Sequence, residues 1–154
     1  MDTTLQVDLS TLLQLHEQPI MEEAVATLNR ARLPHYQTSQ EENAARLQRL
    51  FELTRDCVQR KAVLPIVTYA EELARGRFAG GFDLSEVQTA FNILEETIWR
   101  HIAEEMEPTA FPNAFGMTSA VLGAGKEALA REYVSLAAHR PIATLDIKAL
   151  FAGV

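Results

Sequence analysis

A chain of 154 residues with 47% hydrophobic and 23% charged residues can bury one sizeable core and has the composition of an ordinary globular protein. The net charge of -7 at pH 7 disfavours nucleic acid and anionic membrane surfaces as partners, because both are negatively charged. The single cysteine excludes an internal disulfide, and we expect a cytoplasmic protein because neither a signal peptide nor an apolar run of about 20 residues is present.

The first predicted helix begins near Asp8 or Ser10 and meets a proline at position 19. Its apolar face combines Leu9, Leu12, Leu13, His16 and Ile20. Pro19 cannot donate the usual backbone hydrogen bond, so the helix either kinks there or restarts with Pro19 in its first turn. The second half, about residues 19–32, is expected to turn Ala24, Leu28 and Ala31 inward, and Pro34 closes it.

Two further helices are predicted before the middle of the chain. Ser39 followed by Glu42 has the spacing of a capping box, so the next helix is expected to begin there. Its buried face is predicted to consist of Leu47, Leu50, Phe51, Thr54, Cys57 and Val58. A third helix is expected from Leu64 or Pro65 to Arg75, with Gly76 ending it in a left-handed cap.

The strongest helical signal lies in residues 82–106. Leu84, Val87, Phe91, Leu94 and Ile98 recur at steps of three and four, which places them on one stripe. Asp83 followed by Glu86 predicts a capping box, and the paired glycines 80–81 break any earlier helix.

A last long helix is predicted over residues 117–139, after an ordered non-helical turn at 107–116 that contains two prolines. Its inner stripe is Thr118, Leu122, Leu129, Tyr133 and Leu136. Gly123 and Gly125 either permit close helix approach or mark a break. Because no segment alternates with a period of two, we expect one all-α domain over residues 1–154, a bundle of five to seven helices with 141–154 as a short tail or terminal helix.

Few side chains in this sequence point to chemistry. The four histidines have no metal-binding spacing, no serine has the surroundings of a nucleophile, and residues 123–126 (GAGK) lack the phosphate-loop pattern. His16, within an apolar stripe, is either a hydrogen-bonded core residue or a ligand or haem contact. His101 is either a boundary residue or such a ligand. We therefore expect no catalytic residue, no metal site and no cofactor.

The central helix carries apolar residues away from its main stripe. Ile93 points nearly opposite the stripe, and Trp99 lies about 80° to one side at ~100° per residue. Either neighbouring helices wrap around this helix, or Ile93, Trp99 and the nearby Arg100 belong to a homodimer interface, where Trp and Arg concentrate binding energy.

Two stretches, residues 30–36 (RARLPHY) and 73–87 (LARGRFAGGFDLSEV) leading into 90–94 and 98–100, resemble the N-terminal domains of RsbR-type stress-signalling co-antagonists. The resemblance implies an all-helical, often globin-like, non-haem sensory or scaffolding domain that dimerises ahead of a signalling output module. This sequence has Val25, Ala26 and Thr27 where a tryptophan is expected. It also ends at Val154, so we expect either a stand-alone copy whose output lies on another chain or a fragment of a longer protein.

The sequence therefore predicts a non-enzymatic regulatory, sensory or scaffolding domain of bacterial signal transduction. Its expected partners are a second copy of the chain, a signalling protein on another chain and, less directly, a small-molecule ligand. The alternative is a globin-like protein that binds haem or another small ligand through His16 or His101.

Overall fold

The computed structural model describes residues 8–31 and 40–139, and every regular element in these ranges is a helix. The elements are α1 (Leu9–Leu15), α2 (Glu17–Arg30), α3 (Gln40–Arg60), α4 (Leu64–Ala79), α5 (Leu84–Glu105), the 3-10 helix η2 (Pro108–Ala110) and α6 (Phe111–His139). The predicted all-α class is confirmed. The expectations for Pro34, Ser39 and the stretch 141–154 concern residues outside these ranges.

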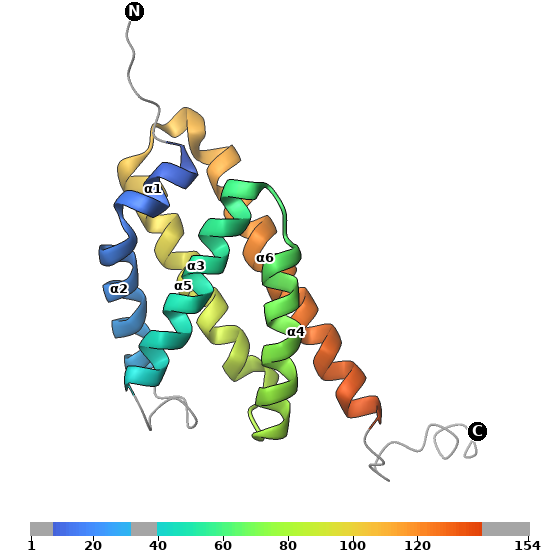
Figure 1. Cartoon of the computed structure of the whole chain (residues 1–154). Helices are drawn as coiled ribbons and strands as arrows, with labels where there is room; N and C mark the ends of the chain where they lie inside the picture. Colours follow the sequence, from blue (N-terminus) through green and yellow to red (C-terminus); the bar gives the residue numbers. More distant parts are fainter. Residues whose placement is uncertain (1–7, 32–39, 140–154) are drawn as a thin grey trace, which may run out of the picture.

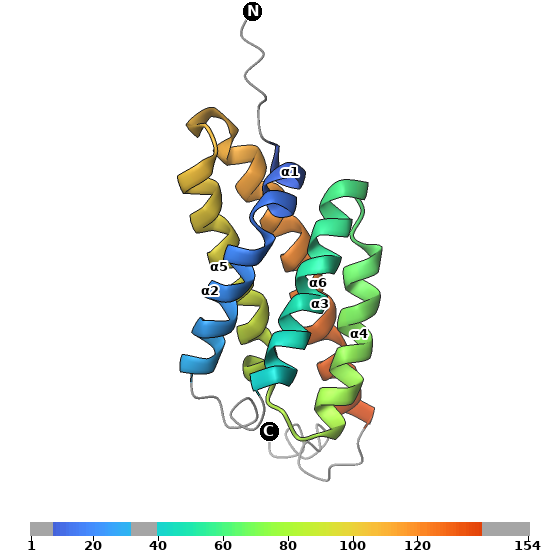
Figure 2. The same ribbon diagram turned by 60° about the vertical axis from the view of Figure 1, so that its left-hand side comes forward.

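The helices pack as a bundle around α5 and α6 (Figures 1 and 2). The longest helix, α6, packs most extensively against α4 and then against α5, while α2 lies along the other side of α5 and also contacts α3. One continuous core of buried side chains runs through these contacts. Four of the five predicted stripe residues of α5, Val87, Phe91, Leu94 and Ile98, are fully buried in it, and Leu84 packs against its edge.

Of the two alternatives predicted at Pro19, a kink within one helix or a restart of the helix, the structure shows the restart. The Asp8 carboxylate caps α1 by accepting a hydrogen bond from the Thr11 backbone N–H at 2.8 Å, and this bond lowers the pKa of Asp8. The chain leaves helical geometry at His16, and α2 restarts with Pro19 in its first turn. Ala24 and Leu28 are buried as predicted, but Ala31 is exposed, because α2 ends at Arg30 and Ala31 is only its cap.

Helix α4 is longer than predicted. Gly76 does not end it; the helix continues to Ala79 and ends at the glycine pair 80–81, where Gly81 has the left-handed φ of 81°. The Gly81 and Phe82 N–H groups donate back to the carbonyls of Phe78 and Arg77. The last turn is held by packing, since Phe78 lies edge-on to Tyr133 with ring centroids 5.6 Å apart.

The predicted turn before the last helix is also wrong in part. The 3-10 helix η2 occupies residues 108–110, and α6 begins at Phe111, six residues before the predicted start. Pro112 fits the first turn, because its missing N–H has no partner there anyway. Phe111 and Phe115 lie one turn apart with their rings tilted against each other and the centroids 5.4 Å apart, which supports helix in this stretch.

Of the three glycines in α6, Gly123 and Gly125 differ in role, and neither breaks the helix. A Cβ built on Gly125 would lie 2.8 Å from Cε1 of Phe91 and 3.2 Å from Cγ1 of Ile66, whereas one built on Gly123 would meet nothing within 4 Å. Gly125 therefore lies where α6 approaches Ile66 of α4 and Phe91 of α5 closely. No helix within residues 8–31 and 40–139 is both long and apolar enough to cross a membrane.

Candidate functional site

The exposed side of α5 carries a shallow apolar groove. Its volume is about 600 Å³, and it is lined by Glu96, Trp99, Arg100, Ala103 and Phe115, which we call the Trp99 groove. Trp99 is 37% exposed and meets Phe115 edge-on, with ring centroids 6.1 Å apart. An indole left partly open on an apolar floor is typical of a contact surface for another molecule.

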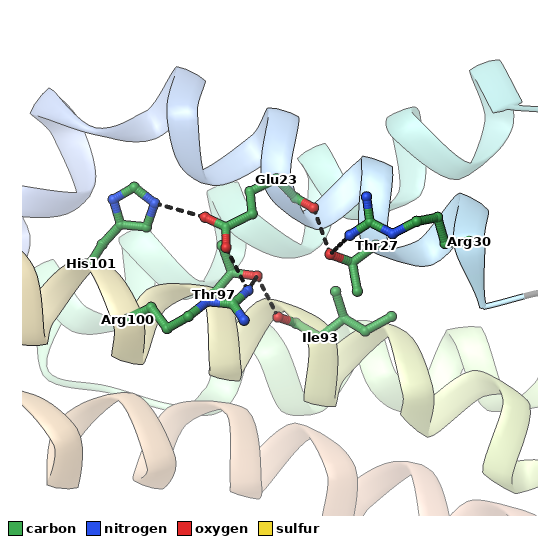
Figure 3. Close-up of polar contacts among 7 residues, drawn as sticks. All are labelled: Glu23, Thr27, Arg30, Ile93, Thr97, Arg100 and His101. Atoms are coloured by element: carbon green, nitrogen blue, oxygen red, sulfur yellow. Dashed lines mark hydrogen bonds and ion pairs between the residues drawn. The ribbon is translucent and has the colours of Figure 1, made fainter.

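A polar cluster links this groove to α2 (Figure 3). The Glu23 carboxylate on α2 lies between two side chains of α5: one oxygen is 2.6 Å from the Arg100 guanidinium, and the other is 3.2 Å from Nε2 of His101. Beside it the Thr97 hydroxyl donates to the Ile93 carbonyl at 2.8 Å and accepts from Arg100 at 3.5 Å. Glu23 thus holds Arg100, a residue of the groove, and His101, a residue of the interior, at the same time.

The two candidate histidines come together beside this cluster. His16, at the break between α1 and α2, lies with its ring centroid 5.9 Å from that of His101 and its Nε2 3.9 Å from a Glu105 oxygen. His101 is only 9% exposed, and its Nδ1 has no hydrogen-bond partner among the described residues. Because a carboxylate only accepts hydrogen bonds, Nε2 of His101 carries the hydrogen shared with Glu23, which leaves Nδ1 as the basic atom of the ring.

The three interface candidates have different surroundings. Ile93 is 7% exposed and packs within this chain's own core, as expected if neighbouring helices wrap around α5. Trp99 and Arg100 are exposed, so they are the two of the three that can offer surface to another molecule. The sequence pattern identified neither Glu23 nor Phe115, since each reaches the site from a different helix.

Other suggested chemistry is absent from the described part of the chain. No three His, Cys, Asp or Glu side chains in residues 8–31 and 40–139 converge to hold a metal ion. The stretch 123–126 lies within continuous helix rather than in a phosphate-binding loop, and Lys126 is bound to Asn92 at 3.0 Å and to Glu95 at 3.4 Å. Cys57 is fully buried, as predicted, and burial raises the pKa of its thiol.

Comparison with known proteins gives one finding. The model of the family described as "RsbT co-antagonist protein rsbRD N-terminal domain" matches residues 19–140 of this chain, a span that runs from Pro19 in α2 through α6 and includes both the Trp99 groove and Glu23. No curated protein and no solved structure matches. A globin-like arrangement and a haem-ligand role for His16 or His101 therefore stay predictions.

Proposed function

The chain belongs to the RsbT co-antagonist protein rsbRD N-terminal domain family, a family of regulatory domains in stress signalling, and from this premise we propose that it works as a homodimer without catalytic activity of its own. In this proposal the chain passes a signal to a protein partner on another chain. Two copies meet through the Trp99 groove. The partly exposed Trp99, on an apolar floor, is the observation that carries the proposal.

The charges along α5 favour a second copy as the occupant of the groove. Glu96 and Arg100 stand one helical turn apart on the exposed side, on either side of Trp99. If two α5 helices cross antiparallel about a two-fold axis, Glu96 of each copy lies opposite Arg100 of the other, so the surface is complementary to itself. Ala103, a small residue at the same groove, lets the two helices approach closely.

The test is the oligomeric state of Trp99→Ala, measured by sedimentation velocity and native mass spectrometry on freshly purified protein. We expect the wild-type chain to be a dimer and the variant to dissociate at least about tenfold more readily, because a central tryptophan is typically worth 2 kcal/mol or more. The far-UV circular dichroism should stay helical. A fold that melts while the dimer persists would make Trp99 a core residue and end the proposal.

A charge-swap pair supplies the matched control. Glu96→Arg alone and Arg100→Glu alone should each weaken self-association, since each places like charges opposite one another across the two-fold axis. The double variant should recover part of the loss. If the single variants dimerise as well as the wild type, the two-fold arrangement at this groove is wrong. Mass spectrometry of the same samples also shows any retained small molecule, including haem.

A further inference from the structure

Arg100 has two competing uses. In the structure its guanidinium is bound by Glu23 at 2.6 Å, yet the same side chain lines the Trp99 groove and, in the proposed dimer, faces Glu96 of the second copy. Arg100 is half exposed, so it can exchange one carboxylate for the other with little change in burial. The strength of the Arg100–Glu23 ion pair therefore determines how readily Arg100 can pair with Glu96 of a second copy at the groove.

The other oxygen of Glu23 is bound to a titratable ring. Histidine is the side chain whose charge ordinarily changes between about pH 5 and 8. When His101 is neutral, Glu23 keeps its full negative charge for Arg100. When His101 takes up a proton, its positive ring stands 3.2 Å from Glu23 and neutralises most of that charge, and it also repels Arg100 from the same side.

The other charged side chains near the rings of His16 and His101 do not act on the Glu23–Arg100 ion pair in this way. His16 lies at the break between α1 and α2, and its Nε2 is 3.9 Å from a carboxylate oxygen of Glu105 on α5. The neighbouring Glu17 is already held at 2.8 Å by Arg55 of α3. Within the described residues, the ion pairs of α6 lie elsewhere: they join it to Arg75 of α4 and to Glu95 of α5, or they lie within α6 itself. The ring centroids of His16 and His101 are 5.9 Å apart, so a positive charge on one ring acts on the other.

We propose that proton uptake by the His16–His101 pair releases Arg100 from Glu23 and thereby strengthens the pairing of two copies at the Trp99 groove. The inference rests on the proposed dimer and adds its regulation: the dimer binds more protons than the monomer, so acidification drives association. The signal reaches the surface through one carboxylate, Glu23, with no change of fold.

The first experiment measures the dimer dissociation constant by sedimentation at several values between about pH 5.5 and 8. We expect affinity to rise by about two- to fivefold toward the acid end, the range of a half-exposed ion pair. His101→Gln should abolish this dependence, because its amide can still donate to Glu23 but cannot take up a proton. His16→Gln should reduce it and displace its midpoint.

Glu127→Gln is the matched control for net charge. It removes one exposed carboxylate on α6, which pairs with Arg131 on the same helix, and so changes the net charge by the same amount as one proton. If general charge neutralisation drives association, this variant will dimerise more tightly at every pH. Under the proposal it leaves both the affinity and its pH dependence close to those of the wild type.

A second readout separates this inference from the proposed dimer. Trp99 is the only tryptophan of the chain and shares the groove with Arg100, so its fluorescence reports on Arg100 at concentrations where the chain is monomeric. A pH-dependent change that disappears in His101→Gln supports the release of Arg100 even if no dimer forms. A dimer whose affinity ignores pH, or a response that survives in His101→Gln, overturns the inference and leaves the dimer standing.

Discussion

The two sides of α5 are held by different kinds of contact. On the side of α4 and α6, Phe91 is buried against Gly125, at a distance where even one added methyl group must displace a neighbour. On the side of α2, Glu23 joins His101 and Arg100 through charges, with Arg100 half exposed. Close packing accounts for stability and allows one arrangement, whereas a partly exposed ionic contact contributes little stability but can change with conditions.

The largest expected effect is the difference in stability between a substitution on the core side of α5 and one on its exposed side. Phe91→Ala should lower the free energy of unfolding by about 3–5 kcal/mol, because it removes a fully buried ring and leaves a cavity against α6. Trp99→Ala, on the exposed side, should cost about 1 kcal/mol or less. Urea denaturation at protein concentrations where the chain is monomeric measures both, because dimer contacts then contribute nothing to the stability. Similar losses for the two variants would remove the distinction between core side and surface side.

A matched pair of glycine substitutions sharpens the packing argument. Gly123→Ala should raise the free energy of unfolding by up to about 1 kcal/mol, because alanine favours helix and the new Cβ meets nothing. Gly125→Ala gains the same helix propensity but forces Phe91 to move. We expect it to be less stable than Gly123→Ala by about 1–3 kcal/mol in thermal or urea denaturation. Equal stabilities would mean that the contact at Gly125 relaxes freely.

On the polar side, removing the shared charge should have a smaller effect. Glu23→Gln should lower the free energy of unfolding by about 1 kcal/mol or less, because both partners of the Glu23–Arg100 pair are in contact with solvent. Glu22→Gln, which loses only an exposed contact with Gln18 on the same helix, is the control. A loss of several kcal/mol specific to Glu23→Gln would show that α2 depends on this ion pair for its position.

The smallest expected effect tests whether the interior excludes water around Cys57. Burial raises the pKa of this thiol above its ordinary 9.0, so the folded state favours the neutral form. The resulting stabilisation is complete below pH 9 and is lost as the pH rises through the folded pKa. Cys57→Ala should therefore lose less stability between about pH 8 and 10 than the wild type does. In the folded wild type, the thiol should react with a thiol reagent only on unfolding.

The sequence by itself determined the helices and most of the core. Spacing of three and four identified the stripe of α5 and the buried face of α3, including Cys57. Local rules predicted the capping box at Asp83 and a first helix that begins near Asp8 or Ser10, of which the structure has Asp8 as the cap. These features depend on residues within one or two turns of each other, so they are visible in the chain itself. The family resemblance was also carried by such local stretches.

Only the tertiary structure decided where helices run on and which side chains meet. Gly76 costs about 1 kcal/mol in a helix, but packing of Phe78 on Tyr133 outweighs that local preference and carries α4 to Ala79. His16 and His101, Glu23 and Arg100, and Trp99 and Phe115 each come from different helices, so no periodicity could pair them. Spacing within one helix was enough to identify the core stripes and to single out Trp99 and Arg100, whereas the partners that these two residues meet depend on how whole helices pack.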